Sequence, residues 1–116
     1  MQVIKERTVI DYNLPEAAVN IEPDADLKEQ MVTLSNAPAL VFDFSNYEEG
    51  RPYSQTRQLR TRFGFTGDIV ALGARKDNVA MIERCGANII SAHEKYSADD
   101  LLPFFEEISD YYQPNY

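Results

Sequence analysis

The sequence predicts one small α/β domain: a mostly parallel sheet of about four βα units with helices on both faces, preceded by an N-terminal strand or hairpin. From Ala18 onward, short apolar runs of strand length alternate with amphipathic stretches of helical period. The 116 residues are 44% hydrophobic and 26% charged, as in ordinary soluble globular domains. We therefore expect residues 1–116 to form a single domain.

The first half of the chain predicts an N-terminal strand pair, two further strands and one helix. Residues 1–16 read as an irregular segment in which residues 3–14 form an irregular or antiparallel strand pair, and residues 18–22 form the first strand of the alternating part. Asp24 or Asp26 can cap the helix that follows. Residues 39–44 are a continuous apolar run, typical of a strand buried on both faces. The helix has its apolar positions at Leu27, Met31 and Leu34.

The centre of the chain predicts a loop, a helix and a strand. The polar residues 45–52 turn the chain, and a helix is expected from about residue 53 to residue 63. Gly64 is placed to end this helix in a left-handed conformation. Residues 68–73 form the next strand.

The last third predicts a short helix, a strand and a final helix. Asp77 is the expected cap of the short helix, Gly86 closes it, and residues 88–92 form the fourth strand. Ser97 begins the final helix, which Pro103 should bend or divide because proline lacks an N–H. Residues 113–116 are expected to fray. The short helix has Val79, Ile82 and Cys85 in register, and the final helix has Leu101, Phe104, Phe105, Ile108 and Tyr112 on one stripe.

Two larger arrangements fit these elements. Strands that alternate with helices over short loops favour right-handed crossovers and an open parallel sheet. Four βα units also equal half of an eightfold barrel, so a homodimer that completes a larger assembly is the alternative.

The charge pattern gives the strongest functional indication. Most of the arginines fall within residues 51–84, although the formal net charge of the chain is −8. A basic centre that begins at a predicted helix N-terminus favours a small oxyanion or an acidic partner, because free N–H groups and the helix dipole add to the arginine charge. The predicted ligand-binding residues are Arg51, Tyr53, Ser54, Arg57 and Arg60.

A structural interpretation of the same segment stays open. Ser54 would then only cap the helix, and Arg57, Arg60 and Arg62 would form a solvated face that pairs with local acids such as Glu48 and Glu49. Cys85 is expected to be a buried structural cysteine, since it lies on the apolar stripe of its helix.

A secondary set of candidate residues follows the predicted strands. Asp43 is a carboxylate inside an apolar strand, so it accepts either from a loop N–H or Arg75, or it faces a ligand. His93 stands where catalytic residues of parallel sheets often lie, and it is equally consistent with a loop histidine. The full secondary set is Asp43, Arg75, Asp77, Arg84 and His93.

Composition excludes several classes. One cysteine and one histidine cannot make a usual zinc or iron–sulfur site, and no Gly-rich dinucleotide or phosphate-loop fingerprint is present, so we expect no metal and no cofactor. A sequence pI near 4.5 disfavours nucleic acid as a partner. No apolar run approaches the roughly 20 residues of a membrane span, and the start lacks the pattern of a signal peptide, so we expect no membrane association and a cytoplasmic location.

Several motifs occur in order in the second part of the chain. They are Glu49-Gly50-Arg51-Pro52-Tyr53-Ser54, Leu59-Arg60, Gly64-Phe65-Thr66-Gly67, Ala71-Leu72-Gly73, Asp77-Asn78, Arg84-Cys85-Gly86 and the final Tyr112-Gln113. Over residues 39–113 the chain resembles the bacterial family called domain of unknown function 934. The sequence departs from the family pattern with Glu49 for aspartate, Pro52 for glycine, Asn78 for glutamine, and Ala87-Asn88 for Phe-Asp.

The resemblance implies a pathway. Members of the family are associated with assimilatory sulfite reduction and are often labelled probable oxidoreductases. The resemblance therefore implies an accessory protein of sulfur assimilation, whereas the basic segment is what predicts that its arginines hold an anion or an acidic surface. Two alternatives stay open: a non-catalytic module that docks on a sulfite reductase subunit, and a small enzyme that uses Asp43, Asp77 or His93 for proton transfer.

Overall fold

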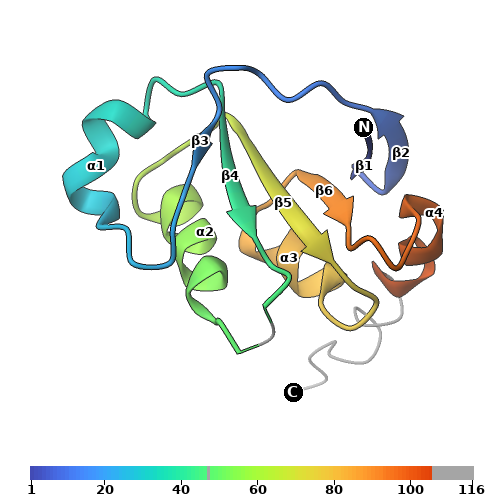
Figure 1. The fold of residues 1–116 in the computed structure, drawn as a ribbon. Coiled ribbons are helices and arrows are strands. Elements are labelled where there is room, and N and C mark those ends of the chain that lie inside the picture. Colours follow the sequence, from blue (N-terminus) through green and yellow to red (C-terminus); the bar gives the residue numbers. More distant parts are fainter. Residues whose placement is uncertain (47, 106–116) are drawn as a thin grey trace.

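The computed structural model describes residues 1–46 and 48–105, and it confirms the predicted α/β class with a six-stranded sheet and helices (Figure 1). No helix in these ranges is long and apolar enough to cross a membrane. The strands are β1 (Gln2–Lys5), β2 (Thr8–Asp11), β3 (Val19–Asn20), β4 (Ala39–Asp43), β5 (Asp68–Ala74) and β6 (Ile89–Ala92). The helices are α1 (Leu27–Leu34), α2 (Arg51–Thr61), α3 (Val79–Cys85) and α4 (Ala98–Leu101).

The sheet is mixed, so the prediction of a mostly parallel sheet was wrong in this respect. Its strand order is β2-β1-β6-β5-β4-β3. Strands β3 to β6 are parallel neighbours, whereas β1 pairs antiparallel with both β2 and β6 and sets Ile4 opposite Ile90. The N-terminal hairpin joins the sheet because β6 would otherwise present a row of unpaired backbone groups.

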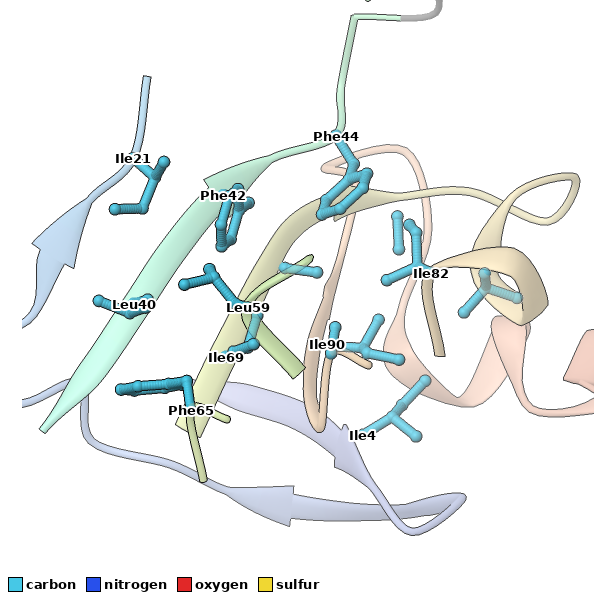
Figure 2. Close-up of a cluster of buried hydrophobic side chains, with 14 of the residues drawn as sticks. Ile4, Ile21, Leu40, Phe42, Phe44, Leu59, Phe65, Ile69, Ile82 and Ile90 are labelled. Carbon is cyan, nitrogen blue, oxygen red and sulfur yellow. The ribbon is translucent and has the colours of Figure 1, made fainter. Parts of the chain in front are cut away.

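The prediction of helices on both faces was also wrong for the described residues. Side chains from all four labelled helices join one apolar cluster with alternate residues of the strands. Figure 2 shows this cluster around Leu59 of α2 and Ile82 of α3, packed on Phe42 and Ile69. The reason is topological: β3 to β6 follow one another across the sheet without a reversal, so each right-handed crossover returns over the same face.

Helix ends follow the sequence signals with small shifts. Asp26 caps α1 by accepting from the Glu29 N–H, and Ser97 caps α4 in a capping box with Asp100. A turn at Leu102 separates α4 from helical residues 103–105, which confirms the expected division near Pro103. The stripe positions Ile108 and Tyr112 and the tail 113–116 lie outside the described residues.

Two predicted helix starts moved. Helix α2 begins at Arg51, earlier than the predicted residue 53, because Pro52 fits the first turn of a helix. The cap of α3 is Asn78 rather than Asp77, and the Asn78 side chain accepts from the Arg75 N–H at 2.8 Å. Gly64 has the positive φ of 66° that its predicted role requires.

One long connection fixes the two edges of the sheet relative to each other. Strands β2 and β3 are consecutive in the chain yet lie at opposite edges, so residues 12–18 run across the sheet above the ends of β4 and β5 (Figure 1). The Tyr12 hydroxyl donates to Asp68 Oδ2 at 3.1 Å. Burial, together with this bond, raises the pKa of Tyr12 to about 12.

The Arg60 guanidinium is the centre of a half-buried polar network at the amino ends of the strands. Its Nε donates to the Gly86 carbonyl at 2.9 Å, and Nη1 donates to the carbonyls of Phe65 at 2.9 Å and Gly67 at 2.8 Å. Its Nη2 donates to Asn88 Oδ1 at 3.2 Å. Burial lowers the pKa of Arg60, and the accepting oxygens compensate for the lost water.

Asn88 extends this network to the connection that crosses the sheet. Its Oδ1 also accepts from the Ile69 N–H at 2.8 Å, and its Nδ2 donates to Asp68 Oδ1 at 3.0 Å. Asp68 in turn accepts from Tyr12. Arg60, Asn88, Asp68 and Tyr12 therefore link α2, β6, β5 and the residue 12–18 connection in one continuous set of hydrogen bonds, which we call the Arg60 network.

The opposite, carboxyl end of the sheet depends on a close backbone approach. The Phe44 N–H donates to the Leu72 carbonyl at 2.8 Å, which brings the chain after β4 against the end of β5. Gly73 has φ of 81°, and a Cβ at this position would lie 2.7 Å from Ser45 Cβ. Only glycine fits there without displacing the loop that leads to α2.

We expect Gly73→Ala to lower the free energy of unfolding by about 1–3 kcal/mol, because it adds both a strained φ and a backbone overlap. Urea denaturation measures this change. Gly50→Ala is the matched control, since a Cβ at Gly50 meets nothing within 4 Å. A loss at Gly73 no larger than the loss at Gly50 would contradict the proposed close approach.

Candidate functional site

The start of α2 carries a local ion pair. Both Nε and Nη2 of Arg51 donate to the Glu49 carboxylate, at 2.8 Å and 2.6 Å. The Arg51 backbone N–H donates to Glu49 Oε1 at 3.0 Å. These bonds lower the pKa of Glu49 from 4.5 to about 2. The Glu49 carboxylate thus binds the Arg51 guanidinium and the first N–H group of α2. This is the position at which the sequence predicts an external anion.

The five predicted ligand residues do not form one surface. Arg60 lies in its network beneath the turn that follows α2, and Arg51 pairs with Glu49. Tyr53, Ser54 and Arg57 are brought together on the side of α2 that faces α3. The Ser54 hydroxyl donates to the Arg51 carbonyl at 3.1 Å, so Ser54 does not cap the helix.

These three residues line an open groove between α2 and α3, which we call the α2–α3 groove. It has a volume of about 370 Å³. Arg57 is exposed, and no ion pair joins it to a carboxylate in residues 1–46 or 48–105. Its Nη2 lies 3.9 Å from Cys85 Sγ. The lining residues are Gly50, Tyr53, Ser54, Arg57, Met81 and Cys85.

The walls of the groove are largely apolar. The Tyr53 ring packs edge-on against the Phe44 ring, with ring centroids 4.9 Å apart. This contact holds the Tyr53 side chain against the core. Cys85 is 3% exposed, so the expectation of a buried cysteine is confirmed. Met81 is 40% exposed. The arrangement therefore offers one guanidinium beside an apolar surface.

Sequence reasoning missed Met81 and the position of Cys85 in the groove. The two residues are four positions apart on α3 and so lie on the same side of that helix. This spacing is visible in the sequence. The sequence does not show that α3 packs beside α2, and it is this packing that makes the Met81 and Cys85 side of α3 a wall of the groove.

The secondary candidates lie apart from the groove. Asp43 Oδ1 accepts from the Ser45 N–H at 2.9 Å, which is the loop-capping role weighed for it. His93 Nδ1 accepts from the Lys95 N–H at 3.2 Å. Because β5 lies between β4 and β6, two strand spacings separate Asp43 from His93, which puts them at least about 10 Å apart. Their use in proton transfer stays a prediction.

The remaining secondary residues belong to α3 and the turn before it. Arg75 follows β5 and its backbone is held by Asn78, while Asp77 is exposed in the same turn. Arg84 is exposed in the last turn of α3. Within the described ranges, no group of His, Cys, Asp and Glu is arranged to hold a metal ion.

Comparison with known families settles the membership of this chain. Residues 18–116 match the model of a family described as a bacterial protein of unknown function, DUF934. The chain belongs to this family. A search of curated proteins and a search of solved structures found no match.

The structure gives a physical role to most of the family motifs. Three motifs each contribute to the Arg60 network: Arg60 itself, the carbonyls of Phe65 and Gly67, and the carbonyl of Gly86, where a Cβ would overlap Cγ of Arg60. These motifs therefore build the scaffold. Asn88, where the family pattern has aspartate, donates to Asp68, which a carboxylate cannot do.

The departures near α2 also have local explanations. Pro52 takes a first-turn position where its missing N–H removes no intrahelical bond. Glu49 reaches both the backbone and the side chain of Arg51. In this member of the family, Glu49 of the motif around Gly50 thus binds the N–H group at the start of α2.

The Glu49 and Arg51 pair predicts a specific pH dependence. Because folding depresses the Glu49 pKa, its contribution is present above the unfolded value of 4.5 and is lost as the pH falls toward about 2. We expect wild type to melt above Glu49→Gln at neutral pH and the two melting curves to converge across this window. Thermal melts at stepped pH measure the difference. A difference that stays constant from pH 7 to the acid end would show that the pair does not form.

Proposed function

We propose that this protein is an accessory protein of assimilatory sulfite reduction that binds a small oxyanion in the α2–α3 groove. The observation that carries the proposal is Arg57, an exposed guanidinium that lines a groove and has no carboxylate partner among the described residues. The family resemblance supports the role in sulfite reduction, and the groove supports the binding of an anion.

The chemistry of the groove suits a tetrahedral or pyramidal oxyanion. A guanidinium presents parallel N–H donors that match two oxygens of one anion. Met81 and Cys85 give the groove apolar walls beside Arg57. The lining residues of the groove include no Asp or Glu.

The same groove supports the second candidate, a module that docks on a sulfite reductase subunit. Met81 is an exposed apolar side chain in the groove that also holds Arg57. An acidic segment with an apolar residue would match both. This function requires salt-sensitive association with the partner and no affinity for small anions.

Titration of sulfite, sulfate and phosphate by calorimetry tests the anion proposal. We expect saturable binding of at least one anion to wild type and about a tenfold loss in Arg57→Gln, the cost of one charge-assisted hydrogen bond. Lys95→Gln removes the same charge from an exposed residue outside the groove and should bind as wild type does.

Two results would decide against the small anion. Null isotherms for all three anions with wild type would contradict the proposal of anion binding. Equal affinities in wild type and Arg57→Gln would contradict it too. Salt-sensitive co-purification with a sulfite reductase subunit, lost in Arg57→Gln and kept in Lys95→Gln, would then support the docking function.

A further inference from the structure

The described part of the chain ends beside α3, which is one wall of the α2–α3 groove. Phe105 is buried, and its ring centroid lies 5.6 Å from the guanidinium carbon of Arg7. Arg7 in turn donates from Nη2 to Oε1 of Glu83, a residue of α3, at 3.1 Å. Residues 106–116, which we call the C-terminal segment, follow Phe105 directly. This segment therefore starts on the Glu83 side of α3.

The composition of the C-terminal segment complements the groove. Its acids are Glu106, Glu107 and Asp110, and it has no Lys or Arg. Asp110 directly precedes two tyrosines, at 111 and 112, so the segment offers a carboxylate next to aromatic side chains. The groove offers the guanidinium of Arg57 next to the exposed side chain of Met81, and no Asp or Glu lines it. Charge and apolar surface thus match on the two sides.

The C-terminal segment is long enough to reach the groove from its starting point. Met81 and Glu83 are two positions apart and so lie on opposite sides of α3. A helix is about 10–12 Å across with its side chains, so the path halfway around it is roughly 16–19 Å. About five or six extended residues span that distance, which brings Asp110 to the Met81 side. The exposed Arg84 lies between Glu83 and Met81 on this path and offers a second positive charge.

We propose that the C-terminal segment docks in the α2–α3 groove of its own chain, with Asp110 paired to Arg57 and the two tyrosines over Met81. The covalent link favours the chain's own segment over that of a second copy, because it gives an effective concentration in the millimolar range. The consequence for ligands rests on the proposed function: a small oxyanion has to displace Asp110 from Arg57 before it binds.

Nuclear magnetic resonance of the full chain, labelled with ¹³C in the methionine methyl groups, tests the docking. An aromatic ring that covers a methyl group shifts its resonance upfield, so the Met81 methyl is the reporter, and Met81→Leu identifies its signal. We expect the signal to lie further upfield in wild type than in Asp110→Arg or Arg57→Glu. The double variant Arg57→Glu/Asp110→Arg should restore the wild-type position, because the reversed charges attract again. Glu94→Arg, a charge reversal in an exposed loop, should leave the signal unchanged.

Calorimetry tests the consequence for anions. If the segment fills the groove for about nine-tenths of the time, its release raises the apparent affinity for an anion about tenfold. We expect this gain in the variant that neutralises the three acids of the segment, Glu106→Gln/Glu107→Gln/Asp110→Asn. A matched variant that neutralises three exposed acids outside the groove, Glu16→Gln/Glu22→Gln/Glu94→Gln, should bind as wild type does.

Three results of the resonance experiment would overturn the docking. One is the same Met81 methyl position in wild type and Asp110→Arg, and another is a double variant that fails to restore the wild-type position. The third is a position that changes with protein concentration, which would assign the groove to the segment of a second copy. Since the methyl signal is read without any anion, a failure of anion binding leaves this test intact, and the two failures are distinguishable.

Discussion

The rest of the structure depends on the hydrogen bonds of one guanidinium. Arg60 holds three carbonyl oxygens and the Asn88 side chain at once, and these acceptors come from the turn after α2, the end of α3 and the start of β6. A planar fork of donors meets such divergent acceptors in a way that a lysine ammonium cannot. Through Asn88 and Asp68 the same bonds reach Tyr12, which anchors the connection between the two sheet edges.

This constraint divides the arginines of the basic segment. Arg60 is committed to the amino ends of the strands, and Arg51 is committed to Glu49 at the start of the same helix. Arg57 and Arg62 remain at the surface and line two different cavities. The positive charge that looks continuous in the sequence is thus spread over structural bonds and two separate cavities, in a molecule whose formal net charge is −8.

Short-range sequence signals predicted the helices and strands well. They could not predict the features that depend on pairing between residues far apart in the sequence. The alternation from Ala18 onward located β3 to β6, and Asp26 and Ser97 marked helix starts, because periodicity and capping act over a few residues. Nothing local says that the N-terminal hairpin pairs with β6 or that the crossovers share one face. Arg60 was predicted as a ligand residue because the sequence shows its charge but hides acceptors 26 and 28 positions away. The Arg51 and Glu49 pair spans only two positions, yet Glu49 was predicted to pair with arginines further along the helix.

Urea denaturation of Arg60→Lys beside Arg57→Lys tests the central claim most directly. Both variants keep the charge and change only the geometry of the donors. The account predicts that Arg60→Lys loses about 2–4 kcal/mol of unfolding free energy, because half-buried carbonyls are left without donors, while Arg57→Lys changes by less than about 0.5 kcal/mol. Equal and small changes in the two variants would contradict the claim that Arg60 holds the fold together.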